Sequence, residues 1–135
     1  MSRILVIDDE PVLRITLRYL LEQEGHQVWD AENGRVGVDI CRNEHPDLVI
    51  TDIVMPEQEG VTTFEILREE FPEMPVIAMS GAQAPTTIRT AAESGKLAYV
   101  MKPVDTSSLF KLIQSVLKKS PAPVPRRTAP GKSVG

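Results

Sequence analysis

The chain has 135 residues, of which 41% are hydrophobic and 25% are charged, as is typical of one globular domain. Residues 1–119 carry 12 basic and 19 acidic residues, and this acidic body argues against direct nucleic-acid binding, which needs basic surface to neutralise phosphates. No apolar run approaches the roughly 18 residues of a membrane-spanning helix, and the single cysteine, Cys41, excludes an intrachain disulfide and a cysteine-cluster metal site and favours a reducing cytoplasm.

Short apolar runs alternate with segments of helical periodicity along residues 1–119. The runs predict β-strands at 4–7, 28–31, 48–51, 76–79 and 98–101. Three of them lack polar alternation, which is typical of strands buried on both faces of a parallel sheet. The segments between predict helices over 11–24, 34–44, 61–71, 84–94 and 106–119, of which 84–94 has the weakest apolar pattern. Five successive βα units predict an α/β fold, a three-layer sandwich with right-handed crossovers.

The last 16 residues have a different composition, with four prolines, three basic residues and no acid. They contain too few large apolar side chains to offset the entropy lost on ordering. We therefore expect a folded domain over 1–119, followed by a disordered, Pro-rich basic tail or linker over 120–135. The chain would then be a stand-alone module that acts on protein partners, or a piece of a longer protein with an output domain.

Polar residues follow four of the predicted strands. Ligands of open parallel sheets bind beyond the carboxyl ends of the strands, where the strand order reverses. The residues at these ends are Asp8, Asp9 and Glu10 after the first strand, Asp52 after the third, Ser80 and Gly81 after the fourth, and Lys102 and Pro103 after the fifth. If the first and third strands are neighbours, three carboxylates converge, with a hydroxyl and an ammonium beside them.

Clustered carboxylates need a counter-charge. Two like charges ~4 Å apart repel by roughly 4 kcal/mol at an effective dielectric constant of ~20. Mg²⁺ would relieve this repulsion, and it prefers one or two carboxylates together with water and phosphate oxygens. With the metal bound, Asp52 becomes a nucleophile toward a phosphoryl group, whose oxygens Lys102 and Ser80 would hold.

Each of these residues also has a structural interpretation. Asp8 or Asp9 could cap the helix that begins near Pro11. Asp52 and Ser80 could be turn residues, and Lys102 could be a solvated charge. The functional interpretation depends on all of them lying together at the correct ends of four strands.

In order and spacing, these segments resemble the receiver domain of two-component response regulators over residues 3 to about 119. The segments that carry the resemblance are "ILVIDDEP", "ENG" at 32–34, "PDLVITDIVMPEQEG", "PVIAMSG" and "AYVMKP". The resemblance implies a flavodoxin-like (βα)5 fold with a five-stranded parallel sheet in the order 2-1-3-4-5.

The resemblance also implies a role for each residue of the acidic pocket. Asp52 would accept a phosphoryl group from a phosphohistidine of a histidine kinase or a histidine phosphotransfer protein. Mg²⁺ (or Mn²⁺) would be held by Asp9, by Asp52 and by the backbone carbonyl of Val54, with Asp8 acting largely through water. Lys102 would pair with the phosphoryl group, next to a cis peptide bond before Pro103.

The output implied by the resemblance is a change of shape. Ser80 would move inward to the phosphoryl group and Tyr99 would turn into the vacated space. The face formed by the fourth helix, fifth strand and fifth helix would then change for partner binding or phosphorylation-dependent dimerisation. Val54 and Ala82 are small and apolar, so we expect no special acceleration of dephosphorylation. Pro85 is expected to shift the start of the fourth helix.

Two other functions fit parts of the pattern. A Mg²⁺-dependent phosphatase that forms an aspartyl phosphate would also use a strand-end nucleophile, but such enzymes usually carry a second acid two residues later, where this chain has Val54. A degenerate receiver would act only as a scaffold, yet every reactive position is filled. We therefore expect a cytoplasmic signalling switch and not an enzyme in the usual sense, with no membrane partner.

Overall fold

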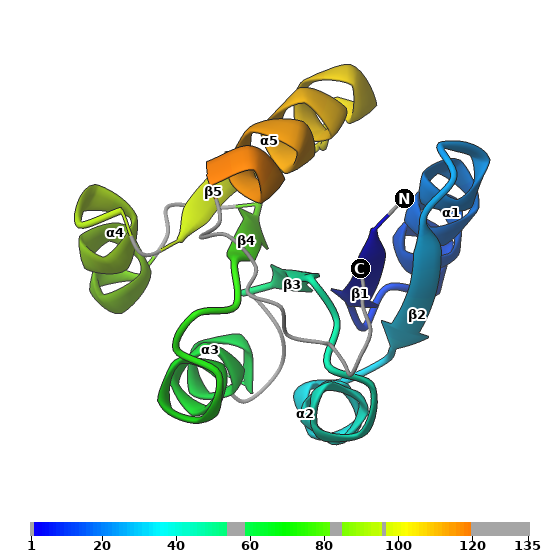
Figure 1. The fold of residues 1–135 in the computed structure, drawn as a ribbon. Coiled ribbons are helices and arrows are strands. Elements are labelled where there is room, and N and C mark those ends of the chain that lie inside the picture. Colours follow the sequence, from blue (N-terminus) through cyan, green and yellow to red (C-terminus); the bar gives the residue numbers. More distant parts are fainter. Residues whose placement is uncertain (1, 54–58, 82–84, 96, 120–135) are drawn as a thin grey trace.

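One five-stranded parallel sheet, in the order β2-β1-β3-β4-β5, forms the centre of the molecule (Figure 1). The computed structural model describes residues 2–53, 59–81, 85–95 and 97–119. The strands are β1 (Arg3–Ile7), β2 (Gln27–Ala31), β3 (Leu48–Asp52), β4 (Val76–Ser80) and β5 (Ala98–Met101). The helices are α1 (Pro11–Gln23), α2 (Gly34–Glu44), α3 (Glu59–Glu70), α4 (Thr86–Glu93) and α5 (Thr106–Lys119).

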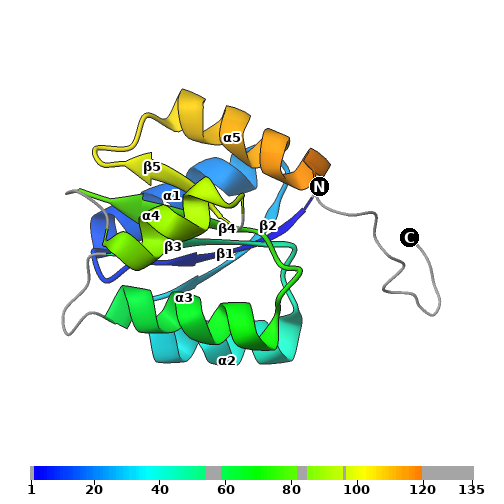
Figure 2. The same ribbon diagram turned by 90° about the vertical axis from the view of Figure 1, so that its left-hand side faces the viewer.

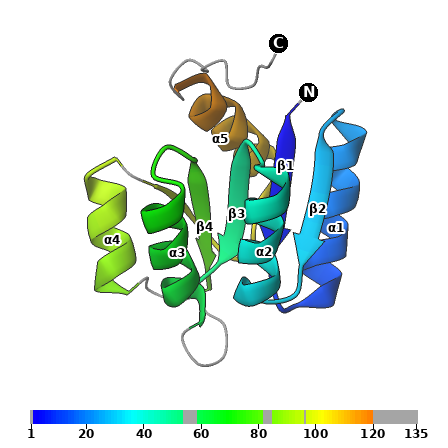
Figure 3. The same cartoon turned by 60° about the horizontal axis from the view of Figure 1, so that its bottom comes forward.

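The helices cover both faces of the sheet. Helices α1 and α5 lie on one face, and α2 and α3 lie on the other (Figure 2). Figure 3 shows α4 beside α3 on this second face. The predicted three-layer α/β sandwich and the 2-1-3-4-5 strand order are confirmed.

Alternate residues of each central strand enter two separate hydrophobic cores. Leu5 and Ile7 pack with side chains of α2, α3 and α4, whereas Ile4 and Val6 pack with side chains of α1 and α5. All five residues of β3 and of β4 are buried. This two-sided burial explains why the central strands have no polar alternation in the sequence.

The predicted element boundaries agree with the structure to within about two residues. The α2 prediction is exact, and Asn33 is its N-cap, with its side chain accepting a hydrogen bond from the Val36 amide. Gly25 and Gly95 follow α1 and α4 with positive φ, as expected of residues that end helices. Helix α4 is shorter than the predicted 84–94, because Pro85 occupies its N-cap and the helix begins at Thr86.

Helix α4 is held by few apolar contacts. Only Ile88 and Ala91 are buried in its eight residues, and threonines occupy much of its remaining surface.

Among the described residues, no helix combines the length and apolar character needed to cross a bilayer. The predicted tail over 120–135 lies outside the described residues.

Candidate functional site

The acidic residues meet at the point where the strand order reverses. Strand β1 pairs with β2 on one side and with β3 on the other, and the β1–β3 register pairs Ile7 with Thr51. Asp8 directly follows Ile7, and Asp52 directly follows Thr51, so both aspartates leave the sheet at the same edge. This is the edge at which an open parallel sheet binds its ligands.

Three carboxylates converge there. One oxygen each from Asp8, Asp9 and Asp52 can be chosen so that all three lie within 4.8 Å of one another. Asp8 and Asp52 are buried, with 0% and 2% of their surface exposed, whereas Asp9 is exposed. The pocket therefore has a buried floor and one carboxylate at its solvent side.

Lys102 provides the positive charge of the pocket. Its Nζ donates a hydrogen bond of 3.0 Å to Asp52 Oδ2 and lies 3.4 Å from Asp8 Oδ2. Burial by itself lowers the pKa of Lys102, but the hydrogen bond and charge of Asp52, together with the charge of Asp8, outweigh burial and raise it. The lysine is thus a fixed cation within the physiological pH range.

The burial of Asp8 disfavours its ionised form. The pKa of Asp8 is raised from 3.8 to about 6, mainly by burial and also by the neighbouring charge of Asp52. The hydrogen bond from the Glu10 amide to Asp8 Oδ1 (2.9 Å) and the charge of Lys102 act in the opposite direction without cancelling the effect. The single ammonium group of Lys102 therefore does not fully offset the cost of burying the Asp8 charge beside that of Asp52.

The donor set suits a hard divalent cation. Asp8 Oδ2 is buried and has no hydrogen-bond partner among the described residues. Its charge partner is Lys102 Nζ at 3.4 Å. The carboxylate of Asp8, together with those of Asp9 and Asp52, offers the oxygen ligands that Mg²⁺ prefers. The remaining predicted ligand, the backbone carbonyl of Val54, lies outside the described residues.

Ser80 lies beside Lys102 at the ends of the last two strands. Ser80 is fully buried at the end of β4, and its carbonyl accepts a hydrogen bond of 2.8 Å from the Lys102 amide. Tyr99, on β5, is half-buried against the core beneath α4. The Lys102–Pro103 peptide bond is cis, as the resemblance implied.

Two features of the site escape sequence reasoning. The N-cap of α1 is Glu10, which makes no side-chain capping hydrogen bond, so the alternative that Asp8 or Asp9 caps this helix is wrong. Arg14 donates a hydrogen bond of 2.9 Å to the Asp8 carbonyl, and its Nε lies 3.3 Å from Asp30 on β2. No motif in the sequence indicates this arginine, because its partners lie on two other segments of the fold.

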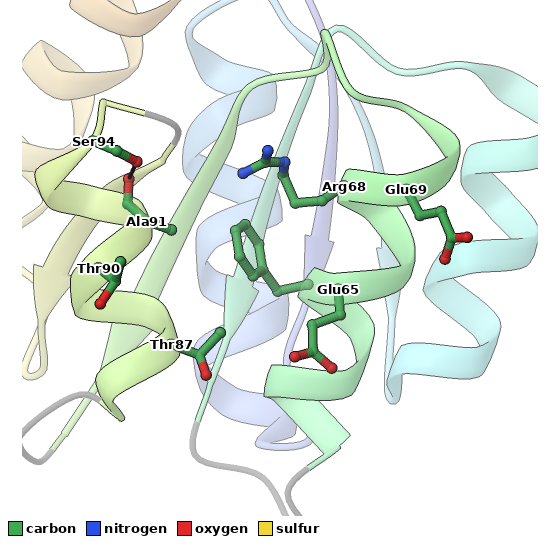
Figure 4. Close-up of a pocket in the computed structure, with 8 residues that line it drawn as sticks. Glu65, Arg68, Glu69, Thr87, Thr90, Ala91 and Ser94 are labelled. Atoms are coloured by element: carbon green, nitrogen blue, oxygen red, sulfur yellow. Dashed lines mark hydrogen bonds between the residues drawn. The ribbon is translucent and has the colours of Figure 1, made fainter.

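A groove of about 640 Å³ between α3 and α4 is separate from the acidic pocket. Among the described residues, its lining includes none of the predicted site residues. Its lining consists of Phe64, Glu65, Arg68, Glu69, Thr87, Thr90, Ala91 and Ser94 (Figure 4). The groove therefore lies between the facing sides of α3 and α4.

The family model of the response regulator receiver domain matches residues 4–114. The chain belongs to the receiver domain family. Protein PilH of Pseudomonas aeruginosa is 40% identical to this receiver domain over 122 residues, which cover 87% of this chain and 98% of PilH. The transcriptional regulatory protein GlrR of Escherichia coli is 33% identical over 119 residues, which cover 88% of this chain but only 27% of GlrR.

Solved structures of receiver domains share the fold. A CheY-like receiver domain protein from Methanospirillum hungatei superimposes with a TM-score of 0.81 at 29% identity, covering 89% of this chain and 96% of that one. The response regulator TrrA from Thermotoga maritima, solved in complex with Mg²⁺ and BeF, has a TM-score of 0.73 at 30% identity and covers 86% of this chain and 99% of its own. The receiver family and its fold, predicted from the sequence, are therefore confirmed.

Proposed function

We propose that Asp52 accepts a phosphoryl group from a phosphohistidine of a histidine kinase or histidine phosphotransfer protein, in a Mg²⁺-dependent reaction that switches the α4–β5–α5 face. The observation that carries this proposal is the position of Asp52, buried at the end of β3, 3.0 Å from Lys102 and beside two further carboxylates. Receiver-family membership supports the proposal. We place this signalling switch, which is not an enzyme in the usual sense, in the cytoplasm.

In the transfer, an Asp52 carboxylate oxygen forms a bond to phosphorus as the bond from phosphorus to the donor imidazole nitrogen breaks. The imidazole leaves with the electron pair of that bond. Lys102 can stabilise the negative charge on the transferring phosphoryl group, because its Nζ already lies against Asp52 Oδ2. Asp8, Asp9 and Asp52 would hold Mg²⁺, which when bound neutralises charge on the transferring group. The Mg²⁺–BeF complex of TrrA supports this assignment.

The link from Asp52 to the output face passes through Ser80 and Lys102. Their backbones are hydrogen-bonded to each other, so a movement of either residue displaces the ends of both β4 and β5. Helix α4 is anchored by two buried residues and borders an open groove, so it can be displaced at low cost in packing. We propose that Ser80 and Tyr99 move together, and that the altered face binds a protein partner or a second copy.

Intact mass after incubation with acetyl phosphate and Mg²⁺ tests the proposal. We expect one added phosphoryl group on the wild-type chain and none with EDTA or in the Asp52→Asn variant, which is nearly isosteric but lacks the nucleophilic oxygen. Continuous release of phosphate from unrelated phosphate esters would favour a phosphatase instead. An unlabelled wild-type protein that is folded and binds Mg²⁺ would favour a scaffold.

The exposed apolar stripe on α1 is the surface that we expect the phosphodonor protein to contact. Val12, Ile15 and Tyr19 follow helical spacing and are 75%, 59% and 60% exposed. Helix α1 begins three residues after Asp8, at the edge through which a donor must reach the buried Asp52. We expect Ile15→Ser to slow transfer from a phosphohistidine protein about tenfold, as for loss of an apolar interface contact, and to leave labelling by acetyl phosphate unchanged.

The donor for this measurement is the kinase or phosphotransfer protein that labels the wild-type chain fastest in a purified panel. Val36→Ser is the matched control, because Val36 is an exposed valine on α2, on the opposite face of the sheet. Equal rates for Ile15→Ser and Val36→Ser with the protein donor would exclude the stripe as the docking surface.

A further inference from the structure

We infer that Glu10 is a positioning residue that controls the charge at the mouth of the pocket. Its carboxylate holds Lys102 toward solvent. Its negative charge strengthens Mg²⁺ binding and opposes the entry of an anionic phosphodonor. This inference rests on the proposed function for its kinetic part only. Its metal-binding part can be measured without any phosphoryl transfer.

The side chain of Glu10 takes little part in holding the fold together. Its Oε1 lies 3.7 Å from Lys102 Nζ, and its side chain is 59% exposed. Although Glu10 is the N-cap of α1, its side chain makes no capping hydrogen bond. The backbone amide, which any residue except proline would supply, makes the hydrogen bond to Asp8. The carboxylate therefore makes no capping hydrogen bond and lies outside the hydrophobic core, and the contact described for it is the one with Lys102.

Lys102 is shared among three carboxylates. Its Nζ lies 3.0 Å from Asp52, 3.4 Å from Asp8 and 3.7 Å from Glu10. Asp8 and Asp52 are buried beneath the ammonium group, whereas Glu10 approaches from the exposed start of α1. A phosphoryl group arriving at Asp52 must compete with Glu10 for the hydrogen-bonding capacity of this lysine.

The charge of Glu10 acts with opposite sign on the two ligands of the pocket. Glu10 Oε1 lies 3.7 Å and Asp52 Oδ2 lies 3.0 Å from Lys102 Nζ, so these two carboxylate oxygens are close to each other. Their separation is shorter than the Debye length at physiological salt, so salt screens the interaction only weakly. A negative charge at that position attracts a divalent cation and repels an anionic donor. Loss of a structural contact would instead weaken both functions together.

Glu10→Gln tests the inference, since it keeps the shape of the side chain and removes the charge. At saturating Mg²⁺ and low salt, we expect labelling by acetyl phosphate to become about threefold faster, the effect of one unit charge about 6 Å away at a water-like dielectric constant. Calorimetric titration with Mg²⁺ alone should show binding about tenfold weaker, because the same charge acts on an ion that carries two charges. Both differences should disappear near 1 M salt, where the Debye length is about 3 Å.

Two further variants serve as controls. Glu24→Gln makes the same charge change at the other end of α1, about 20 Å away along the helix, and should behave as wild type. Glu10→Asp keeps the charge and should also stay close to wild type in both assays, which separates charge from folding. The inference is overturned if Glu10→Gln matches wild type, or if its labelling rate and Mg²⁺ affinity fall together. An unlabelled wild-type chain would refute the proposed function, while the Mg²⁺ titration would still decide the role of Glu10.

Discussion

Lys102→Met is expected to slow phosphorylation of Asp52 by acetyl phosphate about 100- to 1,000-fold, the usual cost of removing a group that stabilises charge in the transition state. Lys102 is the cation that contacts Asp52 in the described pocket, and its raised pKa keeps it charged. Methionine retains much of the length and apolar volume of the side chain, so the loss is mainly that of the ammonium group. The measurement is the rate of mass increase at saturating Mg²⁺.

Metal affinity separates this catalytic role from a loss of folding. Without the competing ammonium group, the carboxylates of Asp8 and Asp52 should bind Mg²⁺ at least as tightly as in the wild type. Lys111→Met, at an exposed position of α5, is the matched control and should leave the labelling rate unchanged. A Lys102→Met variant that binds Mg²⁺ and is labelled at the wild-type rate would remove Lys102 from the mechanism.

Asp8→Asn should stabilise the metal-free protein at neutral pH by up to about 3 kcal/mol, the equivalent of moving its pKa from 3.8 to about 6. Because the folded-state pKa is raised, the folded protein binds more protons than the unfolded chain between these two values. The contribution of Asp8 to stability is therefore fully present below about pH 4 and is lost as pH rises through about 6. Urea unfolding in EDTA should show this loss in the wild type and not in Asp8→Asn.

Asp9→Asn is the control for the stability measurement. Asp9 belongs to the same carboxylate cluster but is exposed, so its replacement should weaken Mg²⁺ binding without the gain in metal-free stability. Mg²⁺ binding by the wild type should strengthen as pH rises through about 6, when Asp8 ionises. Equal pH profiles of stability for Asp8→Asn and the wild type would show that the buried carboxyl carries no such penalty.

The sequence by itself determined the elements and the residues at their ends. Apolar runs without alternation identified the buried strands, and Asn33, Gly25 and Gly95 marked helix boundaries because capping is a local interaction. The positions of Asp8, Asp52, Ser80 and Lys102 followed from the same reasoning, since parallel strands present their carboxyl ends at one edge. Pro85 was expected to shift the start of α4, and the helix indeed begins one residue after it.

Only the tertiary structure decided how these residues differ from one another. Asp8 and Asp9 are adjacent in sequence, yet one is buried with a raised pKa and the other is exposed. Asp8 is still hydrogen-bonded to the end of β2 through its amide, whereas Asp9 lies one residue farther out, in a bend. The contacts of Lys102 with Glu10 and of Arg14 with the Asp8 carbonyl join segments that meet only when α1 packs beside β1 and β5 lies at its place in the sheet. Such contacts depend on packing in three dimensions, and no local pattern in the chain encodes them.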